Sequence, residues 1–86
     1  MILDDEPIAH DIILRFAKEL THLRFQKSCH NPLEALSYLS NHSVDLLFLD
    51  INMPHMKGLE FLSTLTNKPK VILTTAYEEY ALKGYE

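Results

Sequence analysis

The chain has 86 residues, of which 47% are hydrophobic and 23% charged, and its formal net charge is −4. This length suits one small domain, and scattered lysines and arginines in an acidic chain argue against a nucleic-acid-binding surface. No apolar run approaches the about 20 residues that span a membrane, and the opening residues lack a signal-peptide pattern. The single cysteine, Cys29, excludes an intrachain disulfide and favours a reducing compartment, the cytoplasm.

The first residues predict a short buried strand followed by a helix. The apolar stretch 1–3 runs into the acids Asp4 and Asp5, and Pro7 suits the first turn of a helix over residues 7–20. Apolar residues at helical spacing predict the face of this helix that packs on the sheet, namely Ala9, Ile13, Phe16 and Leu20. His10 falls outside this set, and we expect it to be solvated on the polar face.

The next part of the chain predicts a second strand and helix. Apolar and polar residues alternate over 22–26, which is typical of an edge strand with one buried face. Asn31, Pro32 and Glu34 form a helix start, with a cap, a proline at the first helical position and an acid that can reach back. We expect this helix to end near residues 41–42.

An apolar run over 44–49 predicts a strand buried on both faces, and it ends abruptly in Asp50. A helix over 57–65, a β-branched strand over 71–75 and a helix over 76–86 follow. Strands and helices therefore alternate, which predicts an α/β fold with a parallel sheet and helices on both faces. Because the last strand is too apolar for an exposed edge, we also expect a further strand and helix in the complete protein.

Acidic residues follow two of the predicted strands: Asp4 and Asp5 come after the first, and Asp50 ends the third. If these strands are neighbours, the carboxylates converge at the carboxyl edge of the sheet and repel one another, and Mg²⁺ would relieve the repulsion. A cation, a nucleophilic aspartate and a hydroxyl from Thr75 on the next strand suit phosphoryl transfer. The alternative is that the first pair are only helix N-terminal acids and Asp50 a turn residue.

Other reactive residue types show no comparable pattern. Cys29 stands beside His30 without a second cysteine to complete a metal site, and we expect an inert thiol. His55 follows Pro54 in the loop after Asp50 and is expected to be a plain loop residue. The histidines form no i,i+4 pair, so the sequence predicts no zinc site.

Three segments resemble the receiver domain of bacterial two-component response regulators: Leu-Asp-Asp-Glu-Pro at 3–7, Leu-Asp-Ile-Asn-Met-Pro at 49–54 with Gly58, and Thr-Thr-Ala-Tyr at 74–77. The match covers the whole chain, residues 1–86, as one receiver domain. It implies a flavodoxin-like, three-layer fold with strand order 2-1-3-4, the family's fifth strand and last helix being absent from this chain. Residues 76–86 look most like receivers attached to LytTR-type DNA-binding domains.

The resemblance also implies roles for single residues. Asp50 would accept a phosphoryl group from a sensor histidine kinase, with Mg²⁺ held by Asp4, Asp5, Asp50 and the backbone carbonyl of Asn52. Thr75 would hydrogen-bond the phosphoryl group once it is formed. The domain would be a signalling switch rather than a turnover enzyme, would form a homodimer, and would reach DNA only through an output domain after residue 86. Receivers also carry a lysine on the fifth strand, which this chain does not reach.

Two other functions stay open. A metal-dependent phosphohydrolase with Asp50 as a transient nucleophile would use the same acids, although haloacid-dehalogenase-like enzymes carry a second aspartate two residues on, where this chain has Asn52. A phosphorylation-independent dimerisation module would bind Mg²⁺ without taking up a phosphoryl group. Rapid multiple turnover of a phosphate ester would favour the phosphohydrolase, and Mg²⁺ binding without phosphoryl uptake would favour the dimerisation module.

Overall fold

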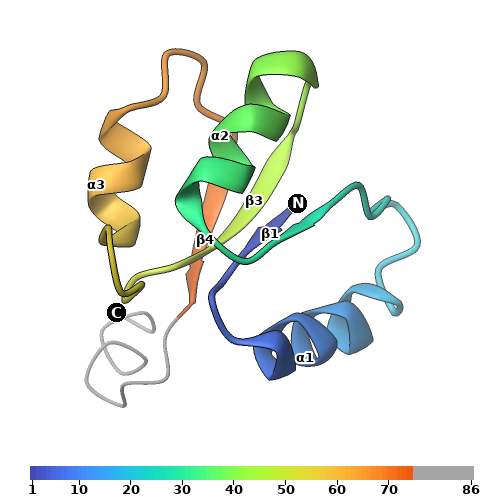
Figure 1. Ribbon diagram of the computed structural model, residues 1–86. Helices are drawn as coiled ribbons and strands as arrows, with labels where there is room; N and C mark the ends of the chain where they lie inside the picture. The colour runs from blue at the N-terminus through green and yellow to red at the C-terminus, as the bar shows by residue number, and fades with distance from the viewer. Residues whose placement is uncertain (75–86) are drawn as a thin grey trace, which may run out of the picture.

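The computed structural model describes residues 1–74, which form a parallel sheet with helices on both of its faces (Figure 1). The elements in chain order are β1 (Ile2–Leu3), α1 (Pro7–Ala17), β2 (Ser28–Cys29), α2 (Pro32–Asn41), β3 (Leu46–Asp50), α3 (Gly58–Ser63) and β4 (Lys70–Thr74). The sheet order is β2-β1-β3-β4 with all pairs parallel, so the predicted α/β fold and strand order are confirmed. Thr75 and the helix expected over 76–86 lie outside the described residues.

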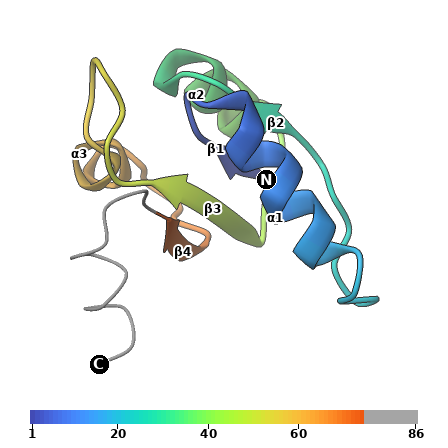
Figure 2. The same ribbon diagram turned by 90° about the horizontal axis from the view of Figure 1, so that it is seen from below.

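The sheet lies between helix α1 on one face and the helices α2 and α3 on the other (Figure 2). The main core lies between the sheet and the helices α2 and α3, where Leu3, Leu47, Leu49, Ala35 and Phe61 are fully buried. On the other face, α1 covers Ile2, Leu46 and Phe48 and leaves a cavity of about 200 Å³ between helix and sheet. Because side chains alternate along β3, each face receives every second residue of the apolar run.

The start of α2 agrees with the sequence prediction. Asn31 is the N-cap, and its Oδ1 accepts a hydrogen bond from the backbone N–H of Glu34 at 2.9 Å. Pro32 occupies the first helical position, where its missing N–H leaves no donor unpaired. The helix ends at Asn41, and β3 begins at Leu46, two residues later than the apolar run suggested.

The predicted buried face of α1 is wrong in part: Ala9 and Ile13 are half-buried, and Ile13 lines the cavity against the sheet, but the other two predicted residues are exposed. Phe16 is 70% exposed and Leu20 45%, and the helix ends at Ala17 rather than at residue 20. The buried residue of α1 is His10, which is 4% exposed. The ring is buried because its Nε2 makes a hydrogen bond to the backbone oxygen of Asp4, so a side chain treated as polar by its type behaves as part of the interior.

The predicted edge strand over 22–26 is also wrong. These residues form no strand, and Phe25 is 52% exposed. The observed β2 has two residues, Ser28 and Cys29, which pair with Ile2 and Leu3 of β1. The position of so short a strand depends on which residues pair with β1. The alternating pattern a few residues earlier gives no information about that pairing. Among the described residues, no helix is long and apolar enough to cross a membrane.

Replacement of Leu47 by alanine tests the main core. Leu47 is fully buried on β3, so Leu47→Ala should lower the free energy of unfolding by about 2–5 kcal/mol through lost burial and a residual cavity. Urea unfolding followed by circular dichroism measures the change. The matched control is Leu33→Ala on α2, where the side chain is 78% exposed and the expected change is within about 0.5 kcal/mol. Equal losses in both variants would contradict this assignment of the core.

Candidate functional site

The acids singled out in the sequence meet at the carboxyl edge of the sheet. Leu3 pairs with Leu49 in the β1–β3 ladder, so the residues that follow or end these strands lie side by side. Oxygen atoms from Asp4, Asp5 and Asp50 all lie within 4.8 Å of one another, in an arrangement that could hold a metal ion. The expected convergence is confirmed, and its cause is the pairing of β1 with β3.

Asp4 is held at three points. Its N–H donates to the backbone oxygen of Cys29 at 3.1 Å, and its Oδ1 accepts from the N–H of Glu6 at 2.9 Å. Its own backbone oxygen bonds to Nε2 of His10 at 2.8 Å. Burial raises the pKa of the Asp4 carboxyl, and the hydrogen bond from Glu6 opposes this rise. The carboxyl group therefore has a fixed position and a charge that the surroundings disfavour.

Asp50 ends β3 and is 8% exposed. The pKa of the Asp50 carboxyl is raised to about 7, and burial is the largest cause. The hydrogen bond from the Asn52 N–H lowers this pKa, whereas a hydrogen bond with Asp5 and the negative charges of Asp4 and Asp5 raise it. The Asn52 N–H donates to Asp50 Oδ1 at 3.1 Å, so the turn role considered for Asp50 is real and coexists with the cluster. The neighbouring carboxylates thus oppose ionisation of Asp50 when no cation is bound.

The loop after Asp50 folds back closely on the strand. The N–H of Gly58 donates to the backbone oxygen of Ile51 at 2.9 Å, and the Ile51 N–H donates to Thr74 at 3.0 Å. A Cβ atom on Gly58 would lie 2.2 Å from the backbone oxygen of Asp50, which no side chain tolerates. Glycine is required here by this close approach, and it allows α3 to begin directly against the end of β3.

Two side chains at the site were missed by the sequence prediction. Lys57 donates from Nζ to Asn52 Oδ1 at 2.7 Å, which brings a positive charge to the loop that follows Asp50. Thr74 pairs with Asp50 across β3 and β4, and its buried Oγ1 has no hydrogen-bond partner within residues 1–74. Two features of the sequence could have indicated these side chains: Lys57 stands directly before Gly58, and two threonines follow one another at the end of a strand. Thr75, the predicted hydroxyl donor, lies outside the described residues.

The acids line one side of an open groove of about 510 Å³. Asp50, Asn52 and Thr74 face the first turns of α1 across it, where the apolar side chains Ile8 and Ile12 are exposed. The helix itself begins only at Pro7, and its first turn carries no acid, so Asp4 and Asp5 precede the helix rather than lie within it. The acids are therefore better described as residues of the sheet edge.

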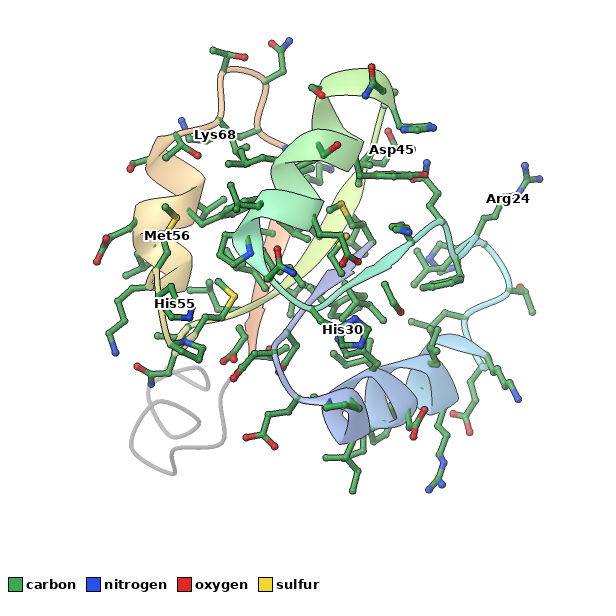
Figure 3. All side chains as sticks on the ribbon, in the orientation of Figure 1. Arg24, His30, Asp45, His55, Met56 and Lys68 are labelled. Atoms are coloured by element: carbon green, nitrogen blue, oxygen red, sulfur yellow. The ribbon has the colours of Figure 1, made fainter. Side chains whose placement is uncertain are left out.

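Asp45 and His55 lie away from this groove (Figure 3). Asp45 precedes β3 and is found at the opposite end of that strand from Asp50. His55 lies exposed in the loop below α3, as expected of a plain loop residue. Cys29 is buried, and burial raises the pKa of its thiol to about 11, which agrees with the inert thiol predicted from the sequence.

The fold and the acid cluster at its carboxyl edge define a class of α/β signalling domain. The chain matches the family model of the response regulator receiver domain over residues 1–86, and it belongs to that family. The resemblance inferred from the three sequence segments is therefore confirmed.

Curated relatives are longer than this chain. The transcriptional regulatory protein BtsR of Escherichia coli (strain K12) is 35% identical over 88 residues, which cover 100% of this chain and 37% of BtsR. An uncharacterized response regulatory protein of Vibrio cholerae is 33% identical with the same coverage of both chains. The chain thus spans 37% of the length of these relatives.

Solved structures show the same fold. The MaeR response regulator bound to beryllium trifluoride superposes with a TM-score of 0.81 at 25% identity, over 98% of this chain and 71% of that chain. The response regulator protein TrrA of Thermotoga maritima, in complex with Mg²⁺-BeF, gives a TM-score of 0.67 at 34% identity, over 92% of this chain and 70% of that chain.

Replacement of Gly58 by alanine tests the close approach of α3 to Asp50. The added methyl group would meet the Asp50 backbone oxygen, so Gly58→Ala should lower the free energy of unfolding by about 1–3 kcal/mol. At other positions in a helix, replacement of glycine by alanine usually stabilises the folded protein. Thermal unfolding gives the measurement, and Leu59→Ala, which changes an exposed residue of the same turn, serves as the control. A stabilised Gly58→Ala variant would refute the contact.

The pKa of Asp50 predicts how stability depends on pH. The folded-state pKa is about 7 against an ordinary value of 3.8, so between these limits the unfolded chain has released a proton that the folded chain keeps. The free energy of unfolding should therefore fall as the pH rises through this window and stay level on either side of it. We expect a loss on the order of 2 kcal/mol, about half of what 1.4 kcal/mol per pKa unit gives, because the groove admits water.

Urea unfolding in the presence of a chelator, repeated across this pH range, measures the loss. Asp50→Asn removes the titrating group and is the matched control, and its profile should lack this contribution. Metal-free protein that becomes more stable relative to Asp50→Asn over the same window would contradict the raised pKa.

Proposed function

We propose that this chain is a phosphorylation-dependent signalling receiver. Asp50 accepts a phosphoryl group from a sensor histidine kinase, with Mg²⁺ held by Asp4, Asp5, Asp50 and the backbone carbonyl of Asn52. The observation that carries this proposal is the convergence of the three carboxyl groups within 4.8 Å at the carboxyl edge of a receiver fold. Membership of the receiver family supports a histidine kinase as the donor.

The chemistry of the donor set supports a hard divalent cation. Carboxylate and carbonyl oxygens are the ligands that Mg²⁺ takes in proteins, usually with waters and phosphate oxygens. The raised pKa of Asp50 means that the cluster resists full ionisation by itself. Mg²⁺, when bound, supplies the positive charge that offsets the acids and the phosphoryl oxygens. The Mg²⁺-BeF complex of TrrA, a relative with the same fold, agrees with this assignment.

The chain's own residues prepare Asp50 for the transfer. The Asn52 N–H holds Asp50 Oδ1 at 3.1 Å, so the carboxylate has a fixed orientation. An ionised oxygen of Asp50 attacks phosphorus, the oxygen–phosphorus bond forms, and the nitrogen–phosphorus bond of the kinase phosphohistidine breaks. The electron pair of that bond returns to the imidazole, which then takes up a proton. The hydroxyl of Thr75 donates a hydrogen bond to the new phosphoryl group. Thr74, whose hydroxyl is buried, is the residue directly before it in the sequence.

The output of the switch is part of the proposal. The chain spans 37% of BtsR, a transcriptional regulatory protein, which supports an output domain of LytTR type that would contact DNA. Phosphorylation replaces the single charge of the ionised Asp50 carboxylate by a phosphoryl group that carries about two negative charges, and the response of Thr75 would alter the surface formed by the residues that follow it. We propose that this change acts on a homodimer in the cytoplasm.

Asn52 disfavours the phosphohydrolase alternative. In an aspartate-based hydrolase the residue two positions after the nucleophile exchanges a proton with the leaving group, and an amide cannot do so. The Asn52 side chain also accepts a hydrogen bond from Lys57 at 2.7 Å, which gives it a structural partner instead. The receiver function therefore fits the residues around Asp50 better.

Labelling with a small phosphodonor tests the proposed function. Purified protein incubated with acetyl phosphate and Mg²⁺ should gain one phosphoryl group by intact mass spectrometry, and a chelator or Asp50→Asn should abolish the gain. Asp45→Asn, which removes the acid at the other end of β3, is the matched control and should keep the label.

The other outcomes separate the alternatives. Label that survives in Asp50→Asn would refute the assigned acceptor. Rapid multiple turnover of a phosphate ester would favour the phosphohydrolase, and Mg²⁺ binding without any phosphoryl uptake would favour a phosphorylation-independent dimerisation module.

A further inference from the structure

His10 is buried beside the acid cluster, although it belongs to none of the motifs. It lies in the first turns of α1, is 4% exposed, and its Nε2 is 2.8 Å from the backbone oxygen of Asp4. A carbonyl oxygen only accepts hydrogen bonds, so Nε2 must carry the proton and donate it. The contact thus joins helix α1 to the residue that follows β1.

The hydrogen bond from His10 satisfies the backbone oxygen of Asp4, which takes no part in the pairing of the strands. β1 ends at Leu3, and the ladder to β2 continues to the Asp4 N–H, which donates to Cys29 at 3.1 Å. The Asp4 carbonyl accepts its hydrogen bond from His10. Because this carbonyl belongs to the peptide plane that joins Asp4 to Asp5, its orientation determines the direction in which the chain enters Asp5.

Packing alone does not explain a histidine at this position. The second ring nitrogen, Nδ1, is buried and has no hydrogen-bond partner within residues 1–74. Burying such a nitrogen without a partner opposes folding, whereas a leucine of similar size would fill the space without this cost. The donor at Nε2 is therefore the property that distinguishes His10 from an apolar residue.

His30 holds the His10 ring in place. It comes from the turn between β2 and α2 and lies over α1 (Figure 3). The two rings stack with their centroids 4.3 Å apart and their planes inclined by 24°. Nitrogen lone pairs lie in the ring planes, so nearly parallel rings direct them side by side instead of at one ion, and the pair is not a metal site. The stack instead restricts rotation of His10 and keeps Nε2 directed at Asp4.

We propose that His10 is a positioning residue for the acid cluster: by donating to the backbone oxygen of Asp4 it orients the peptide that leads to Asp5, and it thereby increases the affinity of the cluster for Mg²⁺ without touching the ion. This inference rests on the proposed Mg²⁺ site. Residues that orient metal ligands through hydrogen bonds change metal affinity by about 10–100-fold when they are replaced.

Two substitutions separate the donor from the bulk of the ring. His10→Leu keeps an apolar side chain of similar size and removes the donor, and should weaken Mg²⁺ binding about tenfold or more. His10→Gln places an amide N–H where Nε2 stands and should restore most of the affinity. Calorimetric titration of the metal-free purified protein with MgCl₂ gives the dissociation constants, and thermal unfolding with a chelator gives the stability of each variant.

The control is His42→Leu at the C-terminal end of α2. His42 also bonds to a backbone oxygen, that of Tyr38 at 3.1 Å, and stacks on a ring, that of Tyr38 at 4.0 Å. Its loss removes the same kind of contact away from the acids and should leave Mg²⁺ affinity unchanged. A purely structural role for His10 would lower stability in His10→Leu and leave the affinity as it is.

The outcomes are distinguishable. Unmodified protein that does not bind Mg²⁺ would overturn the metal site and this inference with it. Unmodified protein that binds Mg²⁺, together with a folded His10→Leu variant of equal affinity, would overturn this inference alone. Equal weakening in His10→Leu and His10→Gln would show that the donor is not the cause. If His10→Leu does not fold, His10→Gln and the ¹⁵N spectrum of the unmodified protein decide, because the proposal requires a protonated Nε2 and preserved affinity in the glutamine variant.

Discussion

Repulsion among closely placed carboxyl groups is the constraint on which the rest of this structure depends. Asp4, Asp5 and Asp50 present oxygens within 4.8 Å of one another, and burial raises the pKa of Asp4 and of Asp50. Such a cluster opposes folding unless protons or a cation take up the charge. Among residues 1–74, Lys57 is the lysine or arginine nearest to Asp50 in the sequence, and it donates its hydrogen bond to Asn52 instead of to an acid. The cluster is thus maintained by the scaffold and left ready for an external positive charge.

The scaffold fixes the acids mainly through its backbone. β1 has only two residues, yet it lies between β2 and β3, and its pairing with both brings the residues that follow it to the centre of the edge. Fully buried Leu3 and Leu49 secure this pairing from the main core. Gly58 lets α3 begin against Asp50, and His10 ties α1 to Asp4. These contacts therefore act on main-chain atoms of the site.

Local patterns predicted the strand that ends in Asp50 and the cap of α2, because each of these depends on burial or on residues close in sequence. The strand order was predicted only through the resemblance to the receiver family. Local patterns did not locate β2, whose two residues are defined by pairing with β1. They placed His10 on the polar face of α1 although it is buried, since its burial depends on a carbonyl from another part of the chain. The convergence of the acids was predictable because parallel strands share a carboxyl edge. The roles of the acids and of Thr75 stay predictions.

The pairing of Leu3 with Leu49 has a consequence for folding itself. The acids it brings together come from opposite ends of the first fifty residues, so the unfolded chain contains no comparable site. Closure of so long a loop is slow compared with the formation of a helix, and the cluster arises only with the central strands of the sheet. A cation that binds the cluster therefore binds the native state alone, and its binding free energy adds to the stability of the whole domain.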